Sequence, residues 1–240
     1  MIRIEGLKKQ FGGRPVLKGI DLHIPKGQAT AIVGPNGSGK TTMIKTILGL
    51  VKPDDGLIEV NGTRLNGHYE YRHHIGYMPQ IARYPENMRV RELFSFIKDL
   101  RGREPLNEQE LIERFNLAPE MEKPLRVLSG GYRQKVGACL ALMFNPEILI
   151  MDEPTAGLDP KASHIFKELI QKEKAQGKTI LLTSHIMSEL EELTDHVVFI
   201  LEGKIRFNGP MQELIDQSDV KKLEAAVAKM MDTDSEGVPA

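Results

Sequence analysis

The chain has 240 residues, of which 40% are hydrophobic and 27% charged, as in an ordinary soluble globular protein. This length predicts one domain with, at most, a subdomain. Lys and Arg number 32 against 33 Asp and Glu, so the formal net charge is -1, which argues against a dedicated nucleic-acid binder. A single cysteine excludes an internal disulfide framework and favours a reducing compartment.

The apolar runs of the chain are short. A membrane-spanning helix needs roughly 18 apolar residues, and the densest run, residues 138–144, is far shorter. Arg3 and Glu5 stand where a signal peptide would be apolar. We therefore expect a cytoplasmic chain that borrows any membrane part from another protein.

Residues 1–81 have the pattern of strands and turns. Residues 20–24 alternate apolar and polar side chains, and residues 28–33 are predicted as a second strand that leads into a Gly-rich loop. The pattern then predicts a helix over 40–50, a strand over 57–62 that ends in a turn, and a strand over 75–78.

The pattern becomes mostly helical over residues 82–136. Residues 90–100 place their apolar side chains on one helical stripe. Asn107, with Glu110 three residues later, resembles a capping box at the start of another helix. A helical insert is therefore expected after the first strands.

Strands and helices alternate again from residue 137. A helix over 132–144 precedes residues 148–151, which form a fully apolar strand of the kind buried on both faces of a parallel sheet. Asp159 and Pro160 predict the N-cap and first residue of a helix ending near Gly177. Strands at 179–183 and 197–201, a helix over 219–231 and a disordered tail from Asp232 complete the prediction. The expected class is α/β with a helical insertion.

Residues 34–41, Gly-Pro-Asn-Gly-Ser-Gly-Lys-Thr, match the phosphate-loop pattern G-x-x-x-x-G-K-[ST]. Glycines allow backbone amides to point at phosphate oxygens, and the dipole of the following helix favours the same anion. Lys40 adds a positive charge near the β- and γ-phosphates, and the Thr41 hydroxyl can bind Mg²⁺.

The alternative is a chance match in a Gly-rich turn, which the strand-loop-helix context disfavours. A G-x-G-x-x-G dinucleotide fingerprint is absent, because Thr42 stands where its third glycine would be. The candidate nucleotide-binding residues of this segment are Gly34, Pro35, Asn36, Gly37, Ser38, Gly39, Lys40, Thr41 and Thr42.

Two acids, Asp152 and Glu153, directly follow the apolar strand over 148–151. At the carboxyl end of a sheet strand they would face the ligand crevice beside the phosphate loop. Asp152 can then hold Mg²⁺, directly or through water, and Glu153 can polarise an attacking water as general base. The alternative is a solvated acidic turn, which the upstream phosphate loop disfavours.

Ser129, Gly130 and Gly131 precede the predicted helix over 132–144. A hydroxyl, two open amides and a helix N-terminus form a second candidate anion site. A plain N-cap is the simpler interpretation of this segment alone. A second phosphate-binding end makes sense if it serves the nucleotide of a neighbouring subunit.

Together these motifs resemble the ATP-binding cassette (ABC) ATPases, the motor subunits of ABC transporters, and in particular exporter-like, ABC-2 type ATP-binding proteins. The resemblance covers about residues 2–215, with the motifs in family order. They are the Walker A loop at 34–41, the Q-loop at Gln80, the signature at 128–131, Walker B with the catalytic glutamate at 148–153, the D-loop at 156–159 and the switch histidine at 184–185.

The resemblance implies a P-loop NTPase core with a mostly parallel sheet, an N-terminal antiparallel β subdomain and an inserted helical subdomain. The implied ranges are a cassette over 1–215, with its core at 1–81 and 137–215 and its helical subdomain at 82–136. A short C-terminal helix and tail occupy 216–240.

The resemblance also implies roles for single residues. Phe11 would stack on adenine, and Gln80 would contact Mg²⁺ or the water and report to a membrane partner. Ser129 and Gly131 would contact the γ-phosphate bound by the other subunit. His185 would hold the attacking water together with Glu153.

One residue departs from the family pattern, and several others are expected to have no catalytic role. Tyr132 stands where the family's signature most often has Gln, and this puts a contact to the partner's nucleotide sugar in doubt. Asp159 would cross the dimer interface. His68, His73 and His74 predict no metal site, and Cys139 is expected to be an inert core residue.

The predicted function is Mg²⁺-dependent ATP hydrolysis by a homodimer or heterodimer of such subunits. The dimer would drive separate membrane permease subunits from the cytoplasmic face of the membrane, as an exporter. The alternative is a soluble ABC-type ATPase acting on a ribosome or DNA, which the single cassette and neutral charge disfavour. A regulatory module with weak hydrolysis is disfavoured by the intact Glu153.

Overall fold

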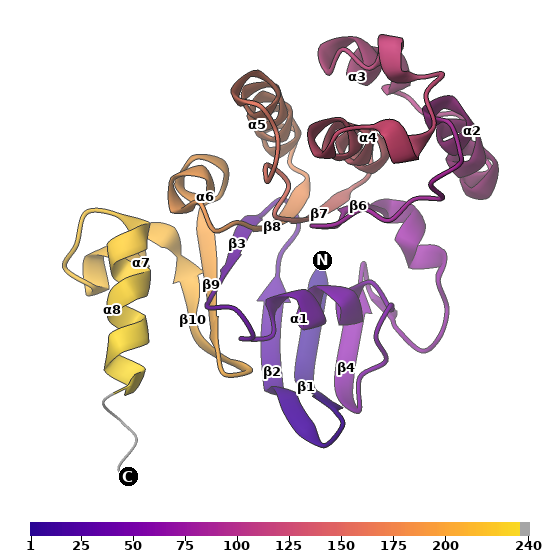
Figure 1. Cartoon of the computed structure of the whole chain (residues 1–240). Helices are drawn as coiled ribbons and strands as arrows, with labels where there is room; N and C mark the ends of the chain where they lie inside the picture. Colours follow the sequence, from indigo (N-terminus) through magenta and orange to yellow (C-terminus); the bar gives the residue numbers. More distant parts are fainter. Residues whose placement is uncertain (236–240) are drawn as a thin grey trace. The chain divides into compact units, whose positions relative to one another are not determined.

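The structure, a computed structural model, describes residues 1–235. The chain divides into two compact units. The first contains Met1–Tyr71 and the residues from Thr179 onward, and the second is Arg72–Lys178. Each unit has its own strands and helices (Figure 1).

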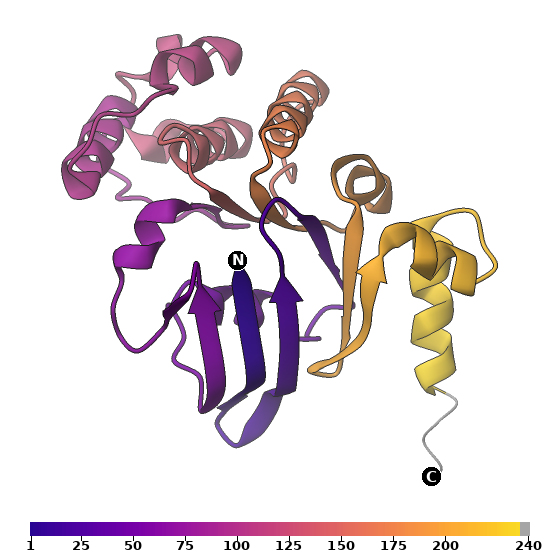
Figure 2. The ribbon, with the colours of Figure 1, turned by 180° about the vertical axis from the view of Figure 1, so that it is seen from behind.

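An antiparallel sheet forms the N-terminal part of the first unit (Figure 2). Its strands are β1 (Ile2–Phe11), β2 (Arg14–Ile24), β4 (Asp55–Val60) and β5 (Thr63–Arg64), in the order β2-β1-β4-β5. Buried Ile2 and Ile4 alternate with exposed Arg3 and Glu5, which is the period of two that a half-buried strand requires. The strand predicted over 20–24 is the C-terminal end of β2.

A second set of strands holds the centre of the same unit. It comprises β3 (Ala29–Val33), β8 (Thr179–Thr183), β9 (His196–Leu201) and β10 (Lys204–Pro210), in the order β10-β9-β3-β8. β3 pairs in parallel with both β8 and β9, and every residue of β3 and β8 is buried. Strands buried along their whole length are typical of parallel sheets covered on both faces. β3 runs into α1 (Lys40–Ile47), and α6 (Met187–Leu193) follows β8.

Two helices end the described chain, α7 (Met211–Gln217) and α8 (Leu223–Ser235) (Figure 1). The prediction of a helix from Asp219 was wrong by four residues, because Asp219 has a left-handed backbone (φ 50°) that an α-helix cannot contain. The predicted tail was also wrong at its start. α8 continues through Ser235. Residues 236–240 of the predicted tail lie outside the described residues.

The second unit contains the parallel pair β6 (Ile75–Met78) and β7 (Ile148–Asp152) and most of the helices. The helices are α2 (Val90–Arg101), α3 (Glu108–Arg114), α4 (Gly130–Leu142) and α5 (Pro160–Ala175), with 3₁₀ turns at Ala118–Glu120 and Leu125–Val127. α4 packs against β6, α2 and α3. Cys139 of α4 is fully buried, and this burial raises the pKa of its thiol.

The capping box predicted at Asn107 is absent. Asn107 does precede α3, but its side chain makes no capping hydrogen bond. Its backbone φ is -122° with ψ 14°, outside the extended region that an N-cap side chain needs, and its N–H donates to the Met143 carbonyl (3.1 Å). Glu110 accepts from Lys172 Nζ instead (3.2 Å). A reciprocal bond of this kind occurs at α2, where Glu92 accepts from the Arg89 N–H (2.9 Å).

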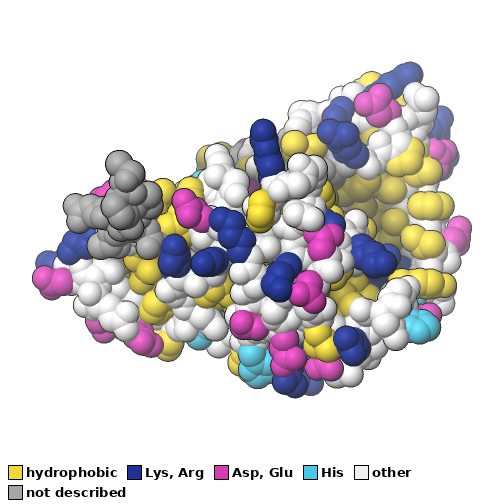
Figure 3. Space-filling view, turned by 90° about the horizontal axis from the view of Figure 1, so that it is seen from below, with side chains coloured by type: hydrophobic (Ala, Val, Ile, Leu, Met, Phe, Trp, Pro, Cys, Tyr) yellow, Lys and Arg dark blue, Asp and Glu magenta, His cyan; other side chains and the backbone are white. Residues whose placement is uncertain are grey.

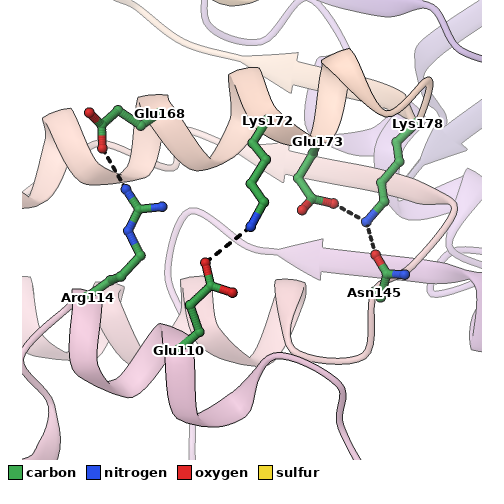
Figure 4. Close-up of polar contacts among 7 residues, drawn as sticks. All are labelled: Glu110, Arg114, Asn145, Glu168, Lys172, Glu173 and Lys178. Carbon is green, nitrogen blue, oxygen red and sulfur yellow. Dashed lines mark hydrogen bonds and ion pairs between the residues drawn. The ribbon is translucent and has the colours of Figure 1, made fainter.

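α5 is tied to its surroundings by two kinds of ion pair (Figure 4). On its exposed side, Lys172 meets Glu110 of α3, and Glu168 meets Arg114 at 2.6 Å. At its C-terminal end, the buried Lys178 ammonium donates to both Glu173 and Asn145. The first kind is solvated, whereas the second is shielded from water.

None of the helices that the structure describes is both long enough and apolar enough to cross a membrane.

Candidate functional site

The loop over residues 34–40 joins the buried strand β3 to α1 in a conformation that only glycine allows at its first position. Gly34 has φ 150°, and a Cβ there would lie 2.0 Å from the Ile200 carbonyl oxygen. Any side chain at this position would displace the loop from the sheet. Lys40, the first residue of α1, places its Nζ over the loop, where it donates to the carbonyls of Gly34 (2.7 Å) and Pro35 (3.1 Å).

The turn between β9 and β10 supports this loop, and the sequence interpretation missed it. The Gly203 N–H donates to the Ser38 carbonyl (3.0 Å), and the Gly203 carbonyl accepts from the Lys18 N–H (2.9 Å). A Cβ at Gly203 would meet the Val16 carbonyl oxygen at 2.2 Å. The consecutive Glu202 and Gly203 between two apolar strands were a turn signal, but nothing local showed which loop the turn would contact.

Ser38 supplies a test of whether this loop fits a phosphate. Its side chain is 2% exposed, and among the described residues its hydroxyl has no hydrogen-bond partner. Leaving such a group unpaired costs about 1–3 kcal/mol. A phosphate oxygen would supply the missing acceptor, and the Lys40 ammonium would supply the compensating charge. The residues present therefore fit a bound phosphate group.

His185 lies at the same edge of the sheet as the loop. β3 and β8 are parallel neighbours with Ala31 opposite Leu182, so residues that follow both strands leave the sheet on one side. Ser184 is buried and its Oγ accepts from the Ile186 N–H (3.0 Å), whereas His185 is exposed. The turn therefore places His185 at the edge where Gly34 begins the loop.

Phe11 ends β1 in the antiparallel sheet, and half of its surface is exposed. The Lys9 ammonium lies 5.2 Å from the centre of the Phe11 ring, within range of a cation–π interaction. That ammonium is held by Asp54, whose Oδ1 is 2.7 Å away. The ring is thus supported by its own chain and still accessible.

In the second unit, the parallel strands β6 and β7 bring Gln80 and Asp152 to one edge. Met78 is opposite Met151, so Gln80 and Asp152 each follow closely after a paired position. Asp152 is 4% exposed, while Gln80 is exposed. Burial, and then the charge of Asp152, raise the pKa of Tyr77 to about 12. The amide and carboxylate oxygens at this edge are of the kind that Mg²⁺ prefers.

Glu153 has an unusual backbone. Its φ is 53°, in the left-handed region, and it is 8% exposed. Non-glycine residues in this region cost about 1–3 kcal/mol and concentrate at functional sites. The buried side chain of Gln134, on α4, donates to the carbonyls of Glu153 (3.3 Å) and Pro154 (3.0 Å). The sequence interpretation missed Gln134 because these contacts join residues 19 and 20 positions apart.

The predicted N-cap at Ser129 is present, and α4 begins two residues earlier than predicted. The Ser129 Oγ accepts from the Tyr132 N–H (3.3 Å), and Ser129 and Gly130 are exposed. A hydroxyl that accepts one bond can still donate its proton to a ligand. A Cβ at Gly131 would meet the Gly157 carbonyl oxygen at 3.0 Å, so the segment after β7 passes directly beside this turn.

Tyr132, the departure from the family pattern, has a partner in its own chain. The Lys135 ammonium lies 4.8 Å from the Tyr132 ring centre and 2.9 Å from Asp159 Oδ2. Asp159 also caps α5, because its Oδ1 accepts from the Ala162 N–H (2.8 Å). The Ala162 bond first, and then Lys135, hold the pKa of Asp159 below its ordinary value. The role across an interface expected for Asp159 stays a prediction.

The candidate residues thus fall into two sets, one in each unit. The first unit holds Phe11, the loop with Lys40, Thr41 and Thr42, and His185. The second unit holds Gln80, the signature at 129–131, Asp152 and Glu153. Among the residues that the structure describes, no group of three or more His, Cys, Asp or Glu is placed to hold a metal ion, and His74 contacts Glu147 at 3.0 Å.

Comparison with known proteins identifies the family. The family model described as ABC transporter matches residues 17–156. The chain is 35% identical over 220 residues to Nod factor export ATP-binding protein I of Ralstonia nicotianae, which covers 90% of this chain and 68% of that protein. It is 34% identical over 208 residues to lantibiotic transport ATP-binding protein SrtF of Streptococcus pyogenes, covering 85% and 89%.

Solved structures agree with the sequence comparison. A structure described as the ATP binding subunit of an ABC transporter superposes with a TM-score of 0.89 at 28% identity, and covers 96% of this chain and 99% of that one. A nucleotide-free ATP-binding cassette gives a TM-score of 0.75 at 28% identity, covering 94% and 98%.

The chain belongs to the ABC transporter family and is one of its ATP-binding, ATP-hydrolysing subunits. The predicted class, a P-loop NTPase fold with a mostly parallel sheet and an antiparallel β sheet, is confirmed. The predicted function as the ATPase of a transporter is confirmed as well.

Proposed function

We propose that two ATPase chains of this kind clamp ATP between them, and that each composite site joins the phosphate loop of one chain to the signature of the other. The exposed Ser129 hydroxyl and the adjacent amides at the start of α4 support this proposal. They would form a second anion site beside the one proposed in the loop. A homodimer or a heterodimer satisfies this arrangement equally.

In the first unit, the loop would bind the phosphates. The backbone N–H groups of Gly34, Asn36, Gly37, Ser38 and Gly39 would donate to the phosphates, while Pro35, which has no N–H, would shape the turn of the loop. The Ser38 hydroxyl would find its acceptor there. Lys40 would turn its ammonium from the loop carbonyls to the β- and γ-phosphates. Thr42 would add a polar contact at the start of α1, and Phe11 would stack on the adenine.

Mg²⁺ would take its protein ligands from Thr41, Gln80 and Asp152, whose hydroxyl, amide and carboxylate oxygens are of the kind that it prefers. When bound, it would neutralise negative charge that builds up on the phosphates. Asp152 suits this role, because a carboxylate is a hard oxygen ligand of the kind that Mg²⁺ prefers.

Glu153 would accept a proton from the attacking water, and His185 would orient that water and the γ-phosphate. In-line attack needs this alignment more than it needs covalent participation by the protein. The strained backbone of Glu153 supports the assignment, because such strain persists where the surrounding structure fixes one geometry.

ATP would act as the switch because both chains touch its γ-phosphate. Moving a dimer from mostly open to mostly closed takes about 5.5 kcal/mol of differential binding. Several charge-assisted hydrogen bonds from Lys40, Ser129 and the Gly131 amide are of that order. Hydrolysis and phosphate release would remove them, and the dimer would reopen.

The partner of the dimer would be a pair of membrane permease subunits, reached from the cytoplasmic face of the membrane. Next to Gln80, Ile81 is 70% exposed and lines a cavity of about 330 Å³ together with Tyr84 and Leu125. An exposed apolar side chain beside a nucleotide-sensing residue is suited to transmit its state to a partner. The names of the two relatives, for Nod factor export and lantibiotic transport, favour export.

The proposed organisation keeps the predicted ranges, with a cassette over 1–215, a core at 1–81 and 137–215, and a helical subdomain at 82–136. α2 and α3 lie within that subdomain. The C-terminal segment 216–240 would contribute α8 and no catalytic group. No relative named above has a name that favours the alternative of a ribosome- or DNA-directed ATPase.

The test is Glu153→Gln. This variant should bind ATP as tightly as the wild-type chain, lose at least about 100-fold in turnover, and associate into a stable dimer in ATP. Phosphate release and gel filtration would measure turnover and association. Glu202→Gln is the matched control, since Glu202 shares the left-handed backbone (φ 49°) but is exposed.

If Glu153→Gln turned over at the wild-type rate, Glu153 would not be the base. If it bound ATP but stayed monomeric, even with its permease present, the composite site would be wrong.

A further inference from the structure

The backbone that carries Glu153 is strained in two ways. Its φ of 53° is left-handed, and the next residue is Pro154. Residues before proline favour extended conformations, because the proline ring clashes with their N–H and Cβ otherwise. An unrestrained chain would therefore relax at Glu153 toward extended φ and carry the carboxylate to a different position. Something outside this dipeptide must hold it.

Gln134 provides that restraint. Its side chain is 7% exposed, and its Nε2 donates to both carbonyls of the strained dipeptide, Glu153 (3.3 Å) and Pro154 (3.0 Å). Within the segment itself, the Ala156 N–H also donates to the Glu153 carbonyl (3.2 Å), as part of a turn. One amide group thus fixes the direction of two successive peptide planes.

The rest of the segment follows the same helix. Gly157 approaches Gly131, where an added Cβ would be 3.0 Å from its carbonyl oxygen, and Asp159 pairs with Lys135 at 2.9 Å. Residues 153–159 therefore lie along the first turns of α4, from Gly131 to Lys135. That same end of α4 carries the signature residues.

We infer that Gln134 is a positioning residue for Glu153: its two hydrogen bonds hold the catalytic carboxylate in place and join it to the signature end of α4. This inference rests on the proposed function, in which Glu153 is the general base. A shift of the signature end of α4 is passed to the Glu153 backbone through the Gln134 amide. Gln134 itself does not touch the nucleotide or the water.

A purely structural role is the competing explanation, since any buried hydrogen bond stabilises a fold. The two explanations differ in what they change. A structural role lowers stability and the amount of folded protein. A positioning role lowers kcat of folded protein and leaves ATP affinity intact, because the phosphate loop belongs to the other unit.

The experiment replaces Gln134 by Met, which keeps an unbranched side chain of similar length but has no donor. We expect kcat to fall about 10- to 100-fold, the usual effect of a misplacement of about 1 Å, while the Kd for ATP changes less than about twofold. Gln109→Met is the matched control, since the Gln109 amide donates to Glu113 (2.7 Å) on the exposed surface of α3. Its kcat should equal that of the wild-type chain.

The decisive measurement repeats Gln134→Met in the Glu153→Gln background under single-turnover conditions. If Gln134 acts through the Glu153 carboxylate, the second substitution changes residual hydrolysis by less than about twofold. A full 10- to 100-fold further loss would overturn the inference. Should Gln134→Met fail to fold, Gln134→Asn keeps the amide but withdraws it by one methylene, and the same split of kcat from Kd is expected.

The two hypotheses fail in different ways. Wild-type turnover by Glu153→Gln would overturn the proposed function itself. Loss of turnover in Glu153→Gln, together with wild-type kcat in Gln134→Met, would overturn only the role of Gln134.

Discussion

Ser38 shows how a single side chain can be unfavourable for the free protein and favourable for the complex. Its hydroxyl is buried without a hydrogen-bond partner among the described residues, directly within the phosphate loop. Nothing in the motif pattern requires serine at this place, so the loop tolerates the cost of an unpaired donor. A phosphate oxygen would accept a hydrogen bond from this hydroxyl and so remove the cost.

We expect Ser38→Ala to have opposite effects on stability and on affinity. Without nucleotide, the variant should melt at the wild-type temperature or higher, because a buried hydroxyl without a partner costs about 1–3 kcal/mol. Its Kd for ATP should rise about tenfold, since a hydrogen bond to a charged group contributes about 1.5 kcal/mol. Thermal unfolding with and without ATP measures both quantities.

Ser184→Ala is the control for this prediction. Ser184 is also buried, but its Oγ accepts from Ile186 and contacts Glu189 at 3.4 Å, so its removal should lower the melting temperature. A Ser38→Ala variant that lost stability without nucleotide would contradict the prediction, because it would reveal a partner for the hydroxyl.

Residues of the site differ in whether the sequence alone could predict them. The loop, Asp152, Glu153 and Ser129 belong to contiguous motifs, and each lies where its motif predicts, at a strand end or a helix start. Gln134 and Gly203 lie outside the motif segments and act on chain segments far along the sequence. Their function depends on tertiary contacts, which no local pattern encodes.

At the scale of elements, α5 allows solvated and buried ion pairs to be compared on one helix. Lys172 meets Glu110 at 3.2 Å with both side chains about half exposed. Lys178 is 9% exposed and its partner Glu173 is 6% exposed. Water competes with the first pair and not with the second, so their removal should have different costs.

We expect Lys178→Ala to destabilise the protein by about 3–5 kcal/mol, because it leaves the Glu173 carboxylate buried without its cation. Lys172→Ala should cost less than about 1 kcal/mol, as exposed pairs usually do. Urea unfolding at neutral pH measures both. The double variant Glu173→Leu/Lys178→Met should recover most of the loss, and similar costs for the two single variants would contradict the prediction.

The elements with a strong pattern were predicted well. β6 and β8 have the predicted bounds, and α2 and α5 differ by a residue or two. One error occurred at Asp219, where a left-handed backbone decides the helix boundary. Another occurred at Asn107, whose side chain does not make the capping hydrogen bond that the sequence predicts. The short helices α6 and α7 were not predicted, because seven residues give too little periodicity to distinguish from a turn.

For the whole molecule, the even balance of charge has a counterpart on the surface. On the face shown in Figure 3, basic and acidic side chains are interspersed and do not separate by sign. A net charge of -1 gives two copies little mutual repulsion, so their association depends on specific groups. This is consistent with a dimer whose main contact is a shared nucleotide.

The only cysteine of the chain, Cys139, can report by its reactivity when the fold around it opens. It is completely buried in α4, and its raised pKa keeps it protonated at neutral pH. Maleimide should therefore label the native protein only as fast as the unit Arg72–Lys178 unfolds, and urea should accelerate labelling in step with the loss of helix signal. Rapid labelling of the native protein would contradict this. Any cysteine introduced at an exposed position would then be the one thiol that reacts, so distances between subunits could be followed without first removing a native residue.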